Sequence, residues 1–269
     1  MSAVSISQKL FATVWKFLRE HTRPARRFVS YRIYRWPLVP QLEDGMAMSC
    51  SGCGEDCVAL GWLVDAGVEP NDIRYLDVGA SDPVVLSNTM TMYQRGAKGV
   101  LVEPDSLMAK KLRSRRPRDI VINTAVAFDE RRAATLIRLH PSAFNTFSEA
   151  QAERVVAASA GWPAKLSIVA RTEVKLVPIN EIIERHLDGV APHFLSIDAE
   201  SVDFEILQSL DFSRFRPWII CVEKSRSMAE LDEFLGAKGY RRICETPHNA
   251  MFMLDPLPGS TRCEQAEPS

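Results

Sequence analysis

Acidic side chains end several short apolar runs of this sequence. Asp77 lies in "RYLDVGA" (74–80), Glu103 in "GVLVEP" (99–104), Asp198 and Glu200 in "FLSIDAE" (194–200), and Glu223 in "WIICVEK" (218–224). A carboxylate can take a proton from an alcohol, accept hydrogen bonds from both hydroxyls of a ribose, or bind Mg²⁺ or Ca²⁺. These side chains are therefore the first candidates for a functional site.

A histidine and a group of thiols are further candidates. His248 in "TPHNAMF" could act as a base because neutral imidazole titrates near working pH, although a surface turn is the more ordinary place for it. The stretch "CSGCGEDC" places Cys50, Cys53 and Cys57 at a spacing that suggests metal. A closed zinc site needs a fourth ligand, for which only Cys244 or a distant histidine is available. We assign no metal to these thiols.

The elements that carry the acidic residues form an alternating pattern. Apolar runs at 74–80, 99–104, 120–127, 194–200 and 218–224 are separated by helix-like segments at 84–95, 105–116, 179–187, 201–210 and 227–238. Strands that are apolar throughout and separated by helices indicate a parallel sheet covered on both faces. "YRRICETP" and "NAMFMLD" stand too close together for a helix between them, so they predict an antiparallel pair that finishes the sheet. Residues 128–178 predict an insertion with two strands and a helix at 148–159.

Ligands of an open parallel sheet bind beyond the carboxyl ends of its strands, and that is where these carboxylates fall. Gly79 and Ala80 would let the backbone approach a nucleoside closely, and Glu103 would accept the ribose hydroxyls. The loop "DVGASDPV" has one glycine and two carboxylates, Asp77 and Asp82, which would repel a pyrophosphate. The same charges suit the sulfonium and amino group of S-adenosylmethionine.

The bulk composition is that of an ordinary globular protein, but its charge is unevenly distributed. The 269 residues are 46% apolar and 25% charged, with a net charge of −1. Residues 1–40 carry eight basic side chains against one acidic one, a net +7, which leaves −8 for the rest. Residues 1–48 therefore predict a basic amphipathic arm. Its apolar face packs on the body, or the arm meets phosphate or an anionic membrane, and we favour packing for the apolar face. We expect the domain itself to span 49–256 and a disordered tail to span 257–269.

Targeting and partner classes follow from the same composition. We find neither a run of about 18 apolar residues nor a signal peptide, so we expect a cytoplasmic protein. The basic arm would make it membrane-peripheral, and we expect no nucleic-acid partner.

Four motifs in order resemble one known family. "YLDVGASDPVVLSNT" is similar to its D-[IV]-G-A followed by S-N-T, and "GAKGVLVEPD" to its G-W-x-G-[IV]-x-[IV]-E-P. "FLSIDAESVDFEIL" resembles L-x-I-D-x-E-G-x-[DE]-x-x-V-L, and "RPWIICVE" resembles R-P-x-x-[IV]-x-[VI]-E. The family is that of the FkbM-type S-adenosylmethionine-dependent methyltransferases. The resemblance runs from about Cys50 to Asp255.

The resemblance implies a Rossmann-like class I methyltransferase fold: a mostly parallel seven-stranded sheet with helices on both faces and an antiparallel last strand. It also implies methyl transfer to a hydroxyl oxygen of a glycan, a lipid-linked sugar or a secondary metabolite. Ser201 and Ala97 depart from the family pattern, the first at the glycine that follows the acidic pair.

The family's cofactor residues carry over position by position. Asp77, Gly79 and Ala80 would line the methionine and ribose side, and Glu103, beside Pro104, would hold the ribose. Ser87 and Asn88 would shape the cofactor loop, and Asn123 to Ala125 would lie near the adenine. "CSGCGEDCVAL" is similar to the family's [YF]-S-Q-x-G-E-D-x-[IL]-[IL], so Glu55 or Asp56 would lie near the polar end of the cofactor and the thiols would be incidental.

Methyl transfer to an alcohol needs the acceptor oxygen in line with the methyl group and a group that takes its proton. We expect Asp198, Glu200, Glu223 or His248 to be this base, or two of the carboxylates to bind a divalent cation that acidifies the hydroxyl. The structural alternative is that Asp198 or Glu200 caps the next helix. Two other functions stay open: a non-catalytic protein that binds S-adenosylmethionine or a partner, and a nicotinamide oxidoreductase.

Overall fold

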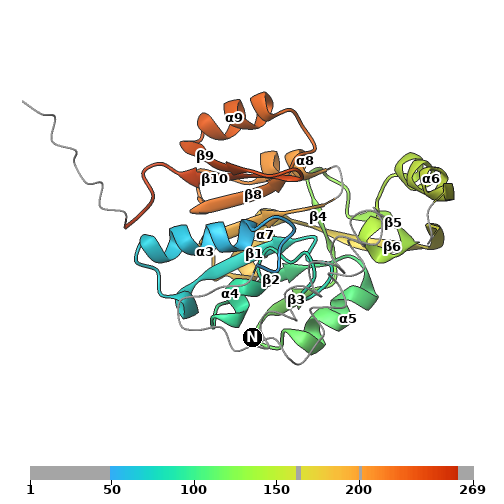
Figure 1. Cartoon of the computed structure of the whole chain (residues 1–269), viewed down its shortest axis with the longest axis horizontal. Helices are drawn as coiled ribbons and strands as arrows, with labels where there is room; N and C mark the ends of the chain where they lie inside the picture. Colours follow the sequence, from blue (N-terminus) through green and yellow to red (C-terminus); the bar gives the residue numbers. More distant parts are fainter. Residues whose placement is uncertain (1–48, 162–164, 200–201, 260–269) are drawn as a thin grey trace, which may run out of the picture.

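The computed structural model describes residues 49–161, 165–199 and 202–259 (Figure 1). The expected basic arm, Glu200, Ser201 and residues 260–269 lie outside this range. Leu257 is buried against the core, so packed structure extends at least to this residue. Within the described residues, none of the helices has both the length and the apolar character needed to cross a bilayer.

The main sheet has seven strands in the order β3-β2-β1-β7-β8-β10-β9. All neighbouring pairs from β3 to β8 are parallel, whereas β10 runs antiparallel to both β8 and β9. The strands are β1 (Arg74–Val78), β2 (Lys98–Val102), β3 (Ile120–Ile122), β7 (Phe194–Ile197), β8 (Ile219–Glu223), β9 (Tyr240–Glu245) and β10 (Asn249–Leu254). This confirms the expected Rossmann-like methyltransferase sheet with an antiparallel last strand.

Two layers of helices bury the two faces of this sheet. One face packs against α7 (Ile179–His186), α8 (Asp203–Ser209) and α9 (Met228–Gly236) through a core that includes Leu76, Ile183 and Leu207. The other face packs against α3 (Glu55–Asp65), α4 (Met90–Gln94) and α5 (Ser106–Arg115). Its core includes Tyr75 of β1, Met92 of α4 and Leu112 of α5. Alternate strand residues enter opposite cores, so every central strand is apolar on both sides.

The helix expected over 84–95 is shorter than the pattern predicts. Only Met90–Gln94 is helical, and the residues before it form a loop. Asp82 Oδ1 accepts hydrogen bonds from the backbone N–H groups of Val84 and Val85 at 3.0 Å each, which satisfies donors that a helix would use. Leu86 has φ 61°, a left-handed conformation that cannot continue a right-handed helix.

The apolar run at 120–127 divides between two sheets. Its first half is β3, and its second half is β4 (Ala125–Ala127), which pairs with β6 (Ser167–Pro178) in a three-stranded sheet ordered β4-β6-β5. The third strand, β5 (Ala133–His140), and helix α6 (Glu149–Ala158) complete an insertion that projects to the right in Figure 1. Thr124 lies between β3 and β4, and its hydroxyl donates to the Lys175 carbonyl of β6 at 2.5 Å, which turns the chain from the main sheet to the smaller one. We call residues 125–178 the insertion module.

Gly79 lets the first loop after β1 touch the end of β7. Its φ is 82°, and a Cβ at this position would lie 1.7 Å from the Asp198 carbonyl oxygen. Because both the conformation and the space require glycine, the backbone of the expected cofactor loop is held directly beside the Asp198 main chain.

Replacing Gly79 by alanine should therefore lower the free energy of unfolding by roughly 3 kcal/mol or more, because backbone atoms cannot move aside cheaply. Thermal or urea denaturation measures this. Two controls separate the causes. Gly67→Ala has the same left-handed conformation, φ 83°, but open space, and should cost only about 1 kcal/mol. Gly61→Ala, in an open helical position, should be stabilising. Equal effects at Gly79 and Gly67 would show that the contact does not matter.

Candidate cofactor and catalytic site

The parallel strands bring the predicted acidic residues to one edge of the sheet. Asp77 lies in register with Ser196 of β7, and Asp198 follows two residues later, with its N–H donating to the Val78 carbonyl at 3.0 Å. Glu103 follows β2, whose last residue accepts hydrogen bonds from the N–H groups of Gly79 and Ala80. The carboxylates therefore surround the loop that begins at Gly79.

Glu103 is held by backbone donors at the end of β2. Its side chain is 5% exposed, and its two oxygens accept hydrogen bonds from the N–H groups of Ser81 at 2.8 Å and Asp105 at 2.7 Å. Burial raises the pKa of Glu103 to about 7, although these two hydrogen bonds oppose the rise. Each oxygen keeps a lone pair, so the carboxylate can accept the two hydroxyls of a ribose.

Asn123 and Pro104 form the neighbouring wall. The Asn123 amide donates to the carbonyls of Glu103 at 2.8 Å and Pro104 at 3.0 Å, which ties the segment between β3 and the insertion module to the turn after β2. Ala125 is buried at the start of β4. This arrangement places the expected adenine-side residues beside the expected ribose carboxylate.

Asp77 is the most enclosed carboxylate of the loop. It is 4% exposed and accepts a hydrogen bond from the Thr89 hydroxyl at 2.7 Å, and burial raises its pKa. The nearby Asn88 amide donates to the Ser196 hydroxyl at 3.1 Å. Asp77, Asn88 and Thr89 thus join the cofactor loop to the strands beneath it.

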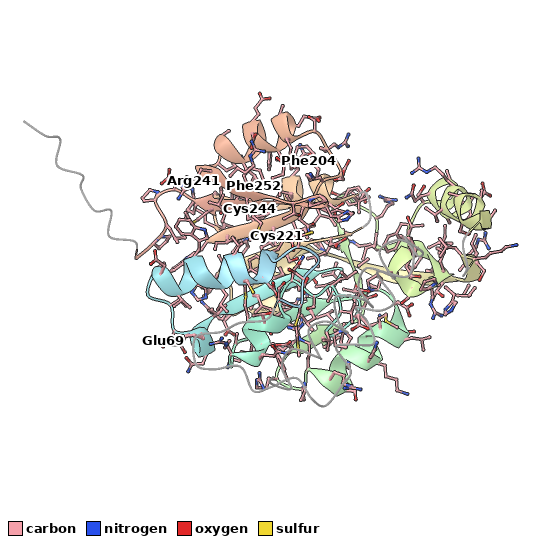
Figure 2. The ribbon with its side chains drawn as sticks, viewed as in Figure 1. Glu69, Phe204, Cys221, Arg241, Cys244 and Phe252 are labelled. Carbon is pink, nitrogen blue, oxygen red and sulfur yellow. The ribbon has the colours of Figure 1, made fainter. Side chains whose placement is uncertain are left out.

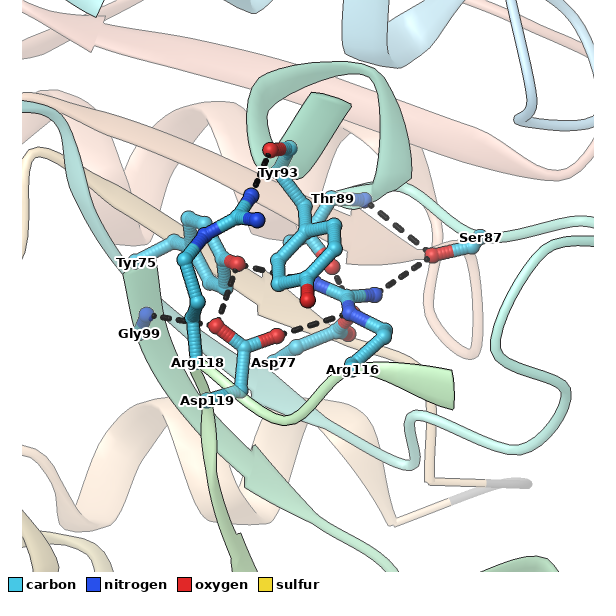
Figure 3. A network of polar contacts seen from close by, with 9 residues as sticks. All are labelled: Tyr75, Asp77, Ser87, Thr89, Tyr93, Gly99, Arg116, Arg118 and Asp119. Atoms are coloured by element: carbon cyan, nitrogen blue, oxygen red, sulfur yellow. Dashed lines mark hydrogen bonds and ion pairs between the residues drawn. The ribbon is translucent and has the colours of Figure 1, made fainter. Parts of the chain in front are cut away.

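A buried arginine supports this loop from behind (Figure 3). Arg116 is fully buried, and its Nε donates to Asp119 Oδ2 at 2.7 Å in an ion pair. Its other nitrogens donate to the hydroxyls of Ser87 at 3.2 Å and Tyr75 at 2.9 Å. Ser87, expected to shape the cofactor loop, is therefore anchored by a charged group that cannot reach water.

Three carboxylates meet where β7 and β8 end. One oxygen from each of Asp198, Asp203 and Glu223 lies within 4.8 Å of the others. Asp203 opens α8 and also accepts a hydrogen bond from the Ala199 N–H at 2.5 Å. Sequence reasoning chose Asp198 and Glu223 but missed Asp203, even though it falls on the [DE] position of the family motif.

The family model for the methyltransferase FkbM domain matches residues 77–242, which is more than half of the chain. The chain belongs to the FkbM methyltransferase family. Its matched region contains the whole carboxyl edge described above, from Asp77 through Glu223. Among curated proteins, none matches this chain.

Three solved structures similar to this FkbM methyltransferase share 14% or less of its sequence. Methyltransferase FkbM from Methylobacillus flagellatus KT is 14% identical with a TM-score of 0.41, and the match covers 68% of this chain and 44% of that one. A TehB-like SAM-dependent methyltransferase from Corynebacterium glutamicum is 8% identical (TM-score 0.38), with 86% and 100% covered. An O-methyltransferase from Bacillus cereus in complex with SAH is 10% identical (TM-score 0.37), with 90% and 96% covered.

Two predicted bases of this FkbM methyltransferase remain, Glu200 and His248. Glu200 is not described. His248 is exposed in the β9–β10 loop, where its carbonyl accepts a hydrogen bond from the Lys224 N–H at 2.8 Å. Its role as a base stays a prediction.

Glu55 and Asp56 are buried at the start of α3 and hold its surroundings together. Glu55 accepts hydrogen bonds from Thr246 at 2.8 Å and Asn249 at 3.0 Å, which connects α3 to the start of β10. Asp56 accepts them from the Cys50 N–H at 2.7 Å and from the Thr91 hydroxyl, among others. A direct contact of either residue with the cofactor stays a prediction.

Three of the thiols, those of Cys50, Cys57 and Cys221, have raised pKa values. Burial, the nearby Asp56 charge and a hydrogen bond to Asp56 raise the pKa of Cys57 to about 11. Burial likewise raises the pKa of Cys50 and of Cys221. Cys221 and Cys244 lie on β8 and β9, on either side of Met251 of β10 (Figure 2). Because the thiolate is the reactive form, the reactivity of Cys50, Cys57 and Cys221 is suppressed near neutral pH.

Binding of S-adenosylhomocysteine should weaken as pH falls through about 7, the raised pKa of Glu103. Below that pH the ligand-free carboxyl is protonated and accepts ribose hydroxyls less well, so affinity should be about tenfold lower at about pH 6 than at about pH 8. Calorimetry at both values measures this. Glu103→Gln should be weaker and nearly independent of pH, which separates Glu103 from Asp77. A flat profile for the wild type would contradict the ribose assignment.

Proposed function

We propose that this FkbM methyltransferase transfers the methyl group of S-adenosylmethionine to a hydroxyl oxygen of a glycan, a lipid-linked sugar or a secondary metabolite. The observation that carries the proposal is the group of three carboxylates, Asp198, Asp203 and Glu223, within 4.8 Å of one another. Gly79 connects it to the expected cofactor loop, because the Gly79 Cα faces the Asp198 carbonyl.

The residues present fit S-adenosylmethionine. Glu103 offers a buried carboxylate to the ribose, and the loop that begins at Gly79 lies directly against the Asp198 main chain. Asp77 and the three carboxylates favour a cationic group over a phosphate. When bound, the cofactor supplies an electrophilic methyl group on a positively charged sulfur.

The carboxylates would orient the acceptor and take its proton. An acceptor hydroxyl donating to Asp198 or Glu223 would have its oxygen aimed at the edge beside Gly79. The carboxylate would take the hydroxyl proton as the oxygen accepts the methyl group that S-adenosylmethionine would supply, which would leave the methyl ether and S-adenosylhomocysteine. Asp203, at the first turn of α8, would hold the backbone after Asp198 in place through its hydrogen bond from the Ala199 N–H.

A divalent cation is a variant of the same mechanism. An oxygen-only group of three carboxylates has the ligand type that Mg²⁺ or Ca²⁺ prefers, and a bound cation would lower the pKa of an acceptor hydroxyl. Turnover with excess EDTA separates the variants: undiminished rates leave the carboxylate as the base, and loss restored by Mg²⁺ requires the cation.

A non-catalytic cofactor-binding protein is the second candidate, favoured by Ser201 at the family's glycine position. Both candidates use Glu103, so cofactor binding alone does not distinguish them. Transfer of a labelled methyl group to a panel of sugar and polyol acceptors does, as does slow hydrolysis of the cofactor.

Asp198→Asn and Glu223→Gln should each lower kcat by about 10² to 10⁴, because each removes a proton acceptor or its electrostatic partner. S-Adenosylhomocysteine affinity should change less than about threefold, since the ribose contacts remain. Asp129→Asn, which breaks an exposed ion pair with Arg131, is the matched control and should leave kcat unchanged. Full activity in both site variants would remove the carboxylates from the mechanism.

A further inference from the structure

The insertion module contacts the turn after β2 through a cluster of three polar side chains. Asp105 Oδ2 accepts hydrogen bonds from Arg138 Nε of β5 at 3.0 Å and from the Asn145 amide at 3.0 Å. Its other oxygen accepts the Leu107 N–H at 2.9 Å, the N-cap contact of α5. One carboxylate therefore joins α5 of the main domain to the insertion module.

The local backbone of β5 is shaped to make this contact. The pairing of β5 with β6 shifts register between Arg138 and Leu139. Such a bulge leaves backbone groups of the strand without their ladder partners and redirects side chains. The side-chain Oδ1 of Asn145 accepts the Leu139 N–H at 2.8 Å, while its side-chain Nδ2 donates to Asp105. Asn145 thus pairs with a backbone group freed by the bulge and binds Asp105 at the same time.

Asp105 is also the direct neighbour of the candidate ribose carboxylate. Its backbone N–H is one of the two donors to Glu103, at 2.7 Å, and its side chain is 1% exposed. A carboxylate this enclosed needs a positive partner, and Arg138, 21% exposed, supplies it. If the Asp105 side chain lost that partner and turned toward water, its N–H would move with the backbone and Glu103 would lose half of its support.

We propose that Arg138 and Asn145 are positioning residues of the cofactor site, supplied by the insertion module rather than by the methyltransferase sheet. They fix Asp105, and through its N–H they fix the orientation of Glu103 toward the ribose. The inference rests on the proposed function, because it assumes that Glu103 binds the ribose. The insertion module would thus contribute to cofactor binding, although it lies far from β1 in the sequence.

Calorimetry with S-adenosylhomocysteine on the full chain tests the inference. Arg138→Met should weaken binding by about tenfold, the loss expected when hydrogen bonds to a buried charge are removed. In turnover, KM for the cofactor should rise by a similar factor while kcat at saturating cofactor stays within about twofold. Arg138→Lys should be intermediate because it keeps the charge but not the planar donor group.

Asn145→Asp gives a second variant that does not depend on Arg138. It keeps an oxygen for the Leu139 N–H but places a like charge against Asp105, so affinity should also fall by about tenfold or more. The matched control is Arg171→Met, which breaks the exposed ion pair with Glu149 elsewhere in the insertion module and should bind as the wild type does.

The outcomes separate the inference from the proposed function. A wild type that fails to bind S-adenosylhomocysteine refutes the function itself. A wild type that binds, with Arg138→Met and Asn145→Asp within twofold of it, overturns only the positioning role. An equal loss in Arg171→Met also overturns it, since general weakening of the insertion module would then explain the data. If Arg138→Met does not fold, Asn145→Asp decides.

Discussion

The buried ion pair between Arg116 and Asp119 is the interaction on which the cofactor side of the structure depends. Arg116 is one of the largest fully buried side chains of the described residues, and a guanidinium cannot discard its charge. It must therefore be matched in place by a carboxylate and by neutral acceptors. Asp119 is this carboxylate, and it also accepts hydrogen bonds from the Tyr75 hydroxyl at 2.7 Å and the Gly99 N–H at 2.9 Å. Strands β1 and β2 and the turn after α5 are consequently fixed relative to one another.

The same pair determines how rigid the loop above it is. Arg116 donates to Ser87, and its charge favours the ionised form of Asp77, whose pKa burial otherwise raises. The loop after β1 contains left-handed residues, Ser81 and Leu86, that an unsupported segment would not hold at low cost. A buried network that is fully satisfied can hold such a conformation because every alternative leaves a charge without a partner. The candidate site is thus supported by two charges, those of Arg116 and Asp119, that are fully buried.

The sequence predicted the sheet well because its signals are local. Each apolar run ends in a turn residue, and the rule that ligands bind at the carboxyl ends of parallel strands located Asp77, Glu103, Asp198 and Glu223 without coordinates. Contacts between segments that are distant in the sequence could not be predicted from these local signals. Asp203 meets Glu223 only when α8 folds back along β7, and Arg138 meets Asp105 only through a bulge in β5. The helix expected at 84–95 failed because side-chain hydrogen bonds from Asp82 compete with helical ones, which periodicity does not register.

The position of β10 has a consequence for how the protein is made. β9 pairs with β10 and with no other strand of the sheet, and β10 also covers the free edge of β8. During synthesis, the residues through β9 emerge while that edge is still open, and β9 has no partner until Leu254 has left the ribosome. The nascent chain therefore carries an open strand edge on β8 until β10 has emerged, and a chaperone or a second nascent chain would meet it there.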